Sequence, residues 1–311
     1  MGIQSDKIWL DGELVDFEKA TVHVLTHTLH YGLGAFEGIR CYAREDGRSA
    51  VFRLREHVER LFESCHIATI KIPWTVEEVI QACLDVIAAN GFKDCYLRPL
   101  VFLGHGEMGL SALNNDTRLC IAAWSWGTYL GDDGLKHGID AQISSFNRHH
   151  INSGMAKGKI TGQYTNSVLA KRAAMADGYK EALMLDTNGY VSEGSGENIF
   201  VVYKGVIHTT PFHGAILGGI TRDTILTLAA EAGIEVQESL MGRDFLYISD
   251  EIFVVGTAAE VTPIRSVDRR DIGTGKPGPI TQRIQAAYFD QVRGSATDHL
   301  EWLTFLDDAQ R

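Results

Sequence analysis

Near the middle of the sequence stands the stretch Ser153-Gly154-Met155-Ala156-Lys157-Gly158-Lys159-Ile160-Thr161-Gly162-Gln163-Tyr164. It sets two lysines among small residues and glycines, and a run with helical spacing of apolar residues follows it up to Gly178. A lysine amine is nucleophilic only when it is neutral, and desolvation or a nearby cation can lower its pKa far enough. Glycines let the backbone approach a flat ligand closely. Most lysines are nevertheless solvated surface charges, so the stretch gains meaning from what the rest of the chain supplies.

The composition is that of an ordinary globular enzyme. Apolar residues make up 45% and charged residues 22% of the 311 residues, which suffice for one large domain or two moderate ones. The net charge of −11 argues against a nucleic-acid partner. No run approaches the ~18 apolar residues of a membrane span, and the first residues lack the apolar segment of a signal peptide. The five cysteines form no C-x-x-C pair, which is typical of reduced thiols in a cytoplasmic protein.

Apolar spacing and turn signals predict a mixture of helices and strands. Asp-Gly at 11–12 and Asn-Gly at 188–189 predict hairpins, and a capping box at 75–78 predicts the start of a helix that ends near Asn90. Further helices are expected over 55–67 and 279–292, and apolar strands over 96–103, 119–126, 139–145, 199–203 and 252–255. Linker-like composition at 131–134 predicts a domain over 1–128, a linker over 129–136 and a larger cofactor-binding domain over 137–311.

Several segments place polar or glycine-rich groups where a ligand would need them. Arg98 interrupts an apolar strand, which is costly unless the arginine meets an anion. The glycines at 218–219 precede a helix whose first N–H groups can bind an anion, and small residues at 256–259 follow a strand. Each has a structural alternative, namely a buried ion pair, a simple N-cap or an ordinary turn. Together with a lysine and the carboxylate of Glu193, they are the groups that pyridoxal phosphate requires.

Several segments, in order and with their spacing intact, resemble the branched-chain aminotransferases of the fold-type IV group of pyridoxal-phosphate enzymes. Lys159-x-x-Gly162-x-Tyr164 resembles the family's lysine segment, and Lys157 lacks the Gly and Tyr at that spacing. The other matching segments are Tyr31-Gly-x-x-x-Phe36-Glu37-Gly-Ile-Arg40, Tyr96-x-Arg98, Ser192-Glu-Gly-x-Gly-Glu-Asn198, and the two glycine-rich turns at 217–222 and 256–260. The resemblance runs from about residue 7 to about 292, with local departures at Lys157 and Gln163.

The resemblance implies a role for each of a set of residues. The catalytic residues would be Lys159, Glu193 and Tyr164, with Glu193 against the ring nitrogen and with Glu197 and Asn198 bracing its loop. The cofactor would also contact Arg60, Leu217, Gly219, Ile220, Thr221, Gly256 and Thr257. The substrate would contact Tyr31, Phe36, Tyr96, Arg98, Leu110, Trp126, Tyr129, Ala258 and Ala259. Arg98, with the hydroxyls of Tyr31 and Tyr129, would receive the second carboxylate of glutamate.

The resemblance also implies a fold and an activity. The fold would be α/β (α+β type), with two domains in the fold-type IV architecture and the cofactor between them, assembled as a homodimer or higher homo-oligomer. The loop at Leu110 would reach the partner's active site. The reaction would be a reversible ping-pong transfer of the amino group between leucine, isoleucine or valine and 2-oxoglutarate, through a pyridoxal 5'-phosphate Schiff base. The partners would be small-molecule amino acids and 2-oxo acids.

Alternatives within and outside the fold group remain open at this point. A D-amino-acid aminotransferase or an aminodeoxychorismate lyase would use the same lysine and glutamate, although the segments at 36–40 and 96–98 disfavour both. A non-catalytic cofactor-binding protein is disfavoured because Lys159, Glu193 and Tyr164 are all present. No metal is expected, because His23, His27 and His30 match no metal-ligand spacing.

Overall fold

The computed structural model describes residues 5–127 and 129–306, so residue 128, where the first predicted domain ends, lies outside the described residues. The chain divides into two compact units. Unit 1 comprises Met1–Trp126, Gly158–Gln163 and Gln291–Arg311, and unit 2 comprises Gly127–Lys157 and Tyr164–Asp290. The predicted domain over 137–311 was continuous, whereas here the lysine segment and the C-terminal segment group with unit 1. Helix α4 (Asp132–His137) occupies much of the predicted linker.

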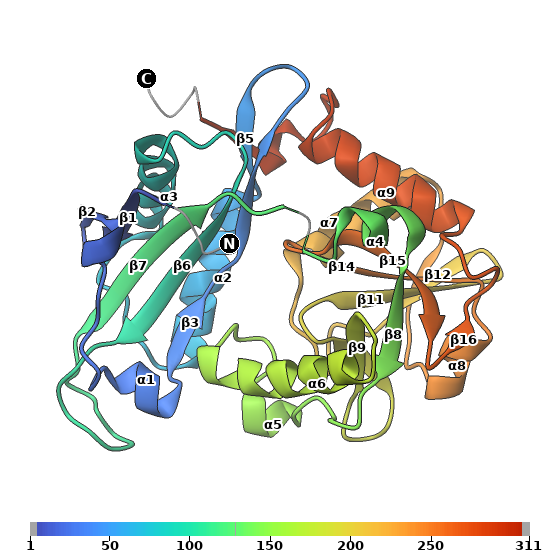
Figure 1. The fold of residues 1–311 in the computed structure, drawn as a ribbon, viewed down its shortest axis with the longest axis horizontal. Coiled ribbons are helices and arrows are strands. Elements are labelled where there is room, and N and C mark those ends of the chain that lie inside the picture. The colour runs from blue at the N-terminus through green and yellow to red at the C-terminus, as the bar shows by residue number, and fades with distance from the viewer. Residues whose placement is uncertain (1–4, 128, 307–311) are drawn as a thin grey trace. The chain divides into compact units, whose positions relative to one another are not determined.

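Unit 1 is built on one sheet (Figure 1). Its described strands are β1 (Lys7–Leu10), β2 (Glu13–Asp16), β3 (Gly34–Phe36), β4 (Ile39–Ala43), β5 (Ser49–Phe52), β6 (Cys95–Leu103), β7 (Thr117–Trp124) and β17 (Leu303–Phe305). They are ordered β17-β5-β4-β6-β7-β1-β2, and β3 also pairs with β6. The predicted hairpin at Asp11-Gly12 is confirmed, and both residues have the positive φ that such a turn needs. Strand β7 begins and ends before the expected 119–126, which leaves Trp126 beyond its end.

Unit 1 also contains helices α1 (His27–Tyr31), α2 (Leu54–Ile67) and α3 (Val76–Ala89), with short 3-10 turns η1 (Phe17–Lys19) and η3 (Leu300–Trp302). Of these, α2 and α3 pack on the sheet through an apolar face. The predicted capping box of α3 is confirmed: Thr75 and Glu78 satisfy each other's backbone N–H groups. Val58 of α2 and Val79 of α3 are fully buried with Leu97 of the sheet in one apolar cluster. This packing fixes α2, which carries Arg60, against the strands that carry the other candidate residues.

Unit 2 contains a mixed sheet. Its strands are β8 (Ile139–Ile143), β9 (Glu181–Leu185), β10 (Val191–Gly194), β11 (Asn198–Tyr203), β12 (Val206–Thr209), β13 (Val236–Glu238), β14 (Glu251–Gly256), β15 (Glu260–Val267) and β16 (Arg270–Asp271). They are ordered β10-β9-β8-β15-β14-β11-β12-β13, with β16 paired to β15. Strand β8 runs parallel to both of its neighbours, and most other pairs are antiparallel. Asn198, the first residue of β11, lies opposite Val255 of β14.

The helices of unit 2 besides α4 are α5 (Ile151–Gly154), α6 (Tyr164–Ala176), α7 (Ile220–Glu231), α8 (Arg243–Tyr247) and α9 (Pro279–Val292), and the 3-10 turn η2 (Thr161–Gln163) precedes α6 within unit 1. Of these helices, α6 begins at Tyr164 and α7 at Ile220, both of which are candidate residues. Helix α6 packs on β9, and α7 packs on β13 and β14. The predicted helix over 279–292 is confirmed as α9, and the predicted mixture of helix and sheet is confirmed in both units. Within the described ranges, no helix has the length and apolarity that a membrane crossing demands.

Candidate active site

The backbone around Lys159 is fixed within unit 1 by two elements, α2 and β3. Its N–H donates to Ser64 Oγ at 2.9 Å, and its carbonyl accepts from the N–H of Phe36 at 3.1 Å. The next residue, Ile160, forms a β-bridge with Ala35. These contacts place the Lys159 amine 4.9 Å from the centre of the Phe36 ring. The lysine segment is therefore aligned with β3, the strand that carries the predicted substrate residue Phe36.

The glycine of the lysine motif is explained by a close backbone contact. The N–H of Gly162 donates to the carbonyl of Gly32 at 2.9 Å, and Thr161 Oγ1 donates to the same carbonyl at 2.7 Å. A Cβ at Gly162 would lie only 3.0 Å from that oxygen, and one at Gly32 would lie 2.9 Å from the Cα of Gly162. Larger residues at either position would push the lysine segment away from β3.

Lys157, the second lysine of the stretch, has a different environment. Its amine contacts the backbone carbonyl oxygens of Phe212, Gly214 (3.3 Å) and Ile216 (2.8 Å) in unit 2. It also lies 4.4 Å from the centre of the Phe212 ring. Its three N–H donors are directed at protein oxygens, so this lysine is committed to a structural contact.

Arg60 is held by a buried carboxylate. Its Nε and Nη2 contact the two oxygens of Glu37 at 2.7 and 2.9 Å, and His57 Nδ1 contacts the same carboxylate at 2.7 Å. Burial alone would raise the pKa of Glu37, but the charges of Arg60 and His57 hold it well below its usual range. Burial lowers the pKa of His57, and the charge of Glu37 opposes that change. The planar guanidinium is therefore oriented by Glu37, as a phosphate contact would require.

The predicted substrate residues of unit 1 gather around Arg98. The guanidinium carbon of Arg98 lies 4.7 Å from the centre of the Phe36 ring and 5.5 Å from that of Tyr96. Tyr96 in turn meets Trp126 edge to face, with ring centres 4.6 Å apart. A Cβ at Gly38 would lie 1.9 Å from the Tyr96 hydroxyl, which explains the glycine in the 36–40 segment. The buried Nε of Arg98 has no hydrogen-bond partner among the described residues, so it can accommodate an anion.

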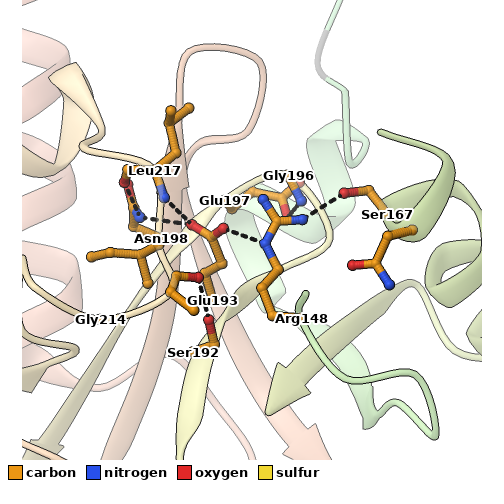
Figure 2. A network of polar contacts seen from close by, with 12 residues as sticks. Arg148, Ser167, Ser192, Glu193, Gly196, Glu197, Asn198, Gly214 and Leu217 are labelled. Atoms are coloured by element: carbon orange, nitrogen blue, oxygen red, sulfur yellow. Dashed lines mark hydrogen bonds and ion pairs between the residues drawn. The ribbon is translucent and has the colours of Figure 1, made fainter. Parts of the chain in front are cut away.

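Glu193 lies buried at the centre of a polar network in unit 2 (Figure 2). Its Oε1 forms an ion pair with Arg148 Nε at 2.7 Å, and its Oε2 accepts from the Leu217 N–H at 3.1 Å and from Asn198 Nδ2 at 3.2 Å. Asn198 Nδ2 also donates to the Leu217 carbonyl at 3.0 Å. Burial raises the pKa of Glu193, and the Arg148 charge and the Leu217 N–H oppose that rise. The expectation that Asn198 braces this loop agrees with these contacts.

Arg148 is the residue that sequence reasoning missed. It follows strand β8 in a segment without regular structure, and its Nη1 donates to Ser167 Oγ on α6 at 3.0 Å (Figure 2). The side chain is only 9% exposed, which is rare for an arginine unless it is paired. Its one sequence signal was a cationic residue shortly after a buried strand, and that signal does not identify Glu193 as the partner.

Two buried glutamates, Glu181 and Glu197, support the same loop. Glu181 accepts from Ser195 Oγ at 2.6 Å and from the Ala182 N–H at 2.7 Å, and it also pairs with Lys171. Burial and the neighbouring charge of Glu181 raise the pKa of Glu197 to about 8. Protonation of Glu197 relieves the repulsion between the two neighbouring acidic side chains in the core.

Two turns in unit 2 present backbone groups near Asn198. Helix α7 begins after Gly219, and a glycine has no side chain with which to cap the helix. A Cβ at Gly219 would lie 2.0 Å from Asn198 Oδ1, so only glycine fits there. The predicted contacts Leu217, Ile220 and Thr221 flank this helix start. The turn at 256–259 joins β14 to β15, directly after Val255, the partner of Asn198. The N-terminus of a helix such as α7 is a favourable position for a phosphate.

The remaining candidates lie at the start of a helix or on exposed segments. Tyr164 is the first residue of α6. Tyr129 is partly exposed, with the Lys171 amine 5.3 Å from the centre of its ring. Leu110 is 90% exposed and Tyr31 is 44% exposed, and His27 Nε2 contacts the Gly109 carbonyl at 2.7 Å between their two segments. An apolar side chain with this degree of exposure is suited to contact with another surface.

The described residues fit pyridoxal phosphate. Glu193 Oε1 is ion-paired with Arg148, and a carboxylate oxygen has a second lone pair with which it can accept a hydrogen bond from a ring N–H. In unit 1, Arg60 is suited to a phosphate and Lys159 supplies an amine; in unit 2, the N-terminus of α7 is itself suited to a phosphate. Two of the histidines that were compared with metal-ligand spacings, His27 and His30, each contact a backbone carbonyl oxygen.

Comparison with known proteins places these features in a family. Residues 34–267, most of the chain, match the amino-transferase class IV family. The chain belongs to this family of aminotransferases.

Individual relatives make the relationship more specific. The chain is 52% identical over 299 residues to the branched-chain-amino-acid aminotransferase of Pseudomonas aeruginosa, which covers 96% of this chain and 97% of that one. The crystal structure of the Escherichia coli branched-chain amino acid aminotransferase superposes with a TM-score of 0.95 at 46% identity, covering 97% and 100% of the two chains. The enzyme of Thermobaculum terrenum, solved in its PLP form, superposes with a TM-score of 0.91 at 34% identity over 98% and 99%. The fold-type IV resemblance inferred from the sequence is confirmed.

Proposed function

We propose that this protein is a pyridoxal-phosphate-dependent branched-chain-amino-acid transaminase. It transfers the amino group reversibly between leucine, isoleucine or valine and 2-oxoglutarate. The names of its relatives agree with this activity, and nothing in the comparisons favours a D-amino-acid aminotransferase or an aminodeoxychorismate lyase.

One observation carries the proposal: a buried glutamate that is paired with Arg148 and whose carboxylate can accept a further hydrogen bond from a ring N–H. Pyridoxal phosphate, when bound, supplies an electron-withdrawing ring that stabilises negative charge at the substrate Cα. Glu193 holds the proton on the ring nitrogen, and it can do so only as a carboxylate. Arg148 and the Leu217 N–H favour that ionised form against the cost of burial.

Lys159 has two roles in the proposal. Its amine would hold the cofactor covalently, and in its free form the amine would move the proton of the substrate Cα as general acid–base. The backbone contacts of Lys159 with Ser64 and Phe36 fix the base of this side chain. The four-carbon stem can then move the amine while its Cα stays in place.

The proposed substrate pocket combines apolar walls with one cation. Phe36, Tyr96 and Trp126 suit a branched aliphatic side chain, whose burial is worth roughly 1.5–3 kcal/mol. Arg98 lies among these rings and would receive the second carboxylate of glutamate or 2-oxoglutarate. Tyr96 and the turn at Thr257-Ala258 would bind the α-carboxylate that both kinds of substrate share.

The assay is direct. Purified protein loaded with pyridoxal phosphate should convert leucine and 2-oxoglutarate into glutamate and the corresponding 2-oxo acid. A panel of L- and D-amino donors separates the alternatives, because a D-amino-acid enzyme would prefer D-alanine over L-leucine. Formation of p-aminobenzoate from aminodeoxychorismate, with no activity on leucine, would contradict the proposal.

We also propose a homodimer in the cytoplasm. The proposal on assembly rests on Leu110 and Leu113, which are 90% and 87% exposed on one loop. Such a loop suits insertion at the active site of a second copy. Mixing an inactive Lys159→Ala chain with an inactive loop deletion should restore activity in hybrid dimers. No recovery, with subunit exchange demonstrated, would contradict shared sites. The cytoplasmic location rests on the free cysteines, four of which are buried.

A further inference from the structure

We infer that Lys157 is a positioning residue: its ammonium group fixes the turn at 212–217 and so directs the Leu217 N–H at Glu193. The inference rests on the proposed function of Glu193, since its catalytic consequence is felt there. Lys157 itself touches neither the proposed substrate residues nor the carboxylate.

The ammonium of Lys157 is bound by the carbonyls of alternate residues in one turn. It contacts the carbonyl oxygens of Phe212, Gly214 and Ile216, while the Phe212 ring lies 4.4 Å away. An ammonium has three N–H donors and no acceptor, so three converging carbonyls satisfy it fully. Three carbonyls that all point at one cation are held in a single conformation of the turn.

The turn depends on side chains because it lies outside the helices and strands. Other side chains also donate to carbonyls in and just before the turn. Ser192 Oγ donates to the carbonyl of Ala215 at 2.8 Å, and Arg222 Nη2 donates to that of Thr210 at 3.1 Å. Ala215 and Ile216 are buried, so water is a poor substitute for a missing donor. Among these contacts, Lys157 serves three carbonyls at once.

The link to Glu193 runs through one peptide unit. The carbonyl of Ile216 and the N–H of Leu217 belong to the same planar group, so orienting one orients the other. Lys157 Nζ lies 2.8 Å from that carbonyl, and the N–H lies 3.1 Å from Glu193 Oε2. The carbonyl of Leu217 is held in turn by Asn198, which also donates to Glu193 (Figure 2).

Charge supports the same arrangement. Burial lowers the pKa of Lys157, and the negative charge of Glu193 opposes that change. The Leu217 N–H lowers the pKa of Glu193, so tilting this peptide would favour the protonated, inactive carboxyl. Lys157 thus acts on Glu193 twice, through the peptide and through its charge.

The test compares Lys157→Met, which keeps the stem but loses the donors, with Lys157→Arg, which keeps both charge and donors. In the holoenzyme, amide hydrogen exchange of the segment 212–217 should rise in the Met variant and stay near wild type in the Arg variant. The kcat for leucine should fall about tenfold in the Met variant, the rate equivalent of one good hydrogen bond to a charged group, with KM little changed. The Arg variant should recover most of this loss.

A double-mutant cycle shows whether the effect passes through Glu193. In a Glu193→Gln background, Lys157→Met should cause little further loss of kcat, because the carboxylate it supports is gone. Fully additive losses, or a Met variant with wild-type exchange and kcat, would overturn the inference. If the Met variant is insoluble, Lys157→Gln replaces it: its amide keeps two donors but loses the charge, so exchange and kcat should still change in the same direction, by less than for the loss of all donors, and wild-type values for both would overturn the inference. Wild-type activity in Glu193→Gln alone would instead overturn the proposed function.

Discussion

Replacing Glu193 by Gln tests the electrostatics of the site, because the two side chains have nearly the same shape. Both carboxylate oxygens face donors: Oε1 faces Arg148 and Oε2 accepts from Leu217 and Asn198. An amide has only one oxygen, so either orientation of the glutamine sets its NH₂ group against a donor. The substitution therefore leaves a buried cation poorly paired and removes the charge that holds the ring proton.

Two magnitudes follow from the structure. Arg148 and Glu193 are 9% and 5% exposed, and breaking a buried ion pair by removing one partner costs about 3–5 kcal/mol. Arg148 keeps its contact with Ser167, which favours the lower end of that range. The rate of Cα-proton removal should fall about 100-fold or more, as for other preorganised electrostatic groups.

Two measurements separate the effects. Urea unfolding of the cofactor-free protein should show the loss of stability in Glu193→Gln, and Glu193→Gln/Arg148→Met should recover part of it because no unpaired charge remains. Single-turnover absorbance changes with leucine should show the same slow proton removal in both variants. Glu193→Gln with a wild-type rate, or a double variant that recovers the rate along with the stability, would refute the assignment of Glu193 to the ring.

Three further predictions concern other residues. Arg98→Met should slow the half-reaction with glutamate far more than that with leucine in single-turnover assays, and equal losses would instead assign Arg98 to the α-carboxylate. Arg60→Ala should raise the dissociation constant of pyridoxamine 5'-phosphate by roughly tenfold to 100-fold, because a charge-assisted hydrogen bond is lost. Arg60→Lys should keep part of the affinity. Unchanged binding in Arg60→Ala would mean that Arg60 pairs with Glu37 without contacting the phosphate. Because the pKa of Glu197 is raised, the folded protein still binds a proton that the unfolded chain releases near pH 4.5. The stability that this proton contributes is present below about pH 4.5 and is lost as the pH rises towards about 8. In Glu197→Gln the urea midpoint of the cofactor-free protein should decline less over that range, and an unaltered pH dependence would contradict the shift.

Elements set by local chemistry could be predicted from the sequence. The Thr75 capping box, the Asp11-Gly12 hairpin and the apolar period of 279–292 each contain their own signal, and the structure has all three. Motif spacing distinguished Lys159 from Lys157, and their environments in the structure differ accordingly, although the covalent role of Lys159 stays a prediction.

Features set by contacts between distant segments could not be predicted. The grouping of 158–163 with unit 1 depends on hydrogen bonds to Ser64 and Phe36, which no local pattern encodes. The partnership of Arg148 with Glu193 joins two segments that fold onto neighbouring parts of one sheet. The role of Lys157 depends on backbone carbonyls, which carry no side-chain signature at all.

The most direct test of the account is to identify the lysine that holds the cofactor. Holoenzyme is reduced with borohydride, digested and mapped by mass spectrometry, with the Lys159→Ala and Lys157→Ala variants as controls. The account predicts a phosphopyridoxyl group on Lys159 in the wild type and in Lys157→Ala, and none in Lys159→Ala. A label on Lys157, or on no lysine of the 153–164 stretch, would contradict it.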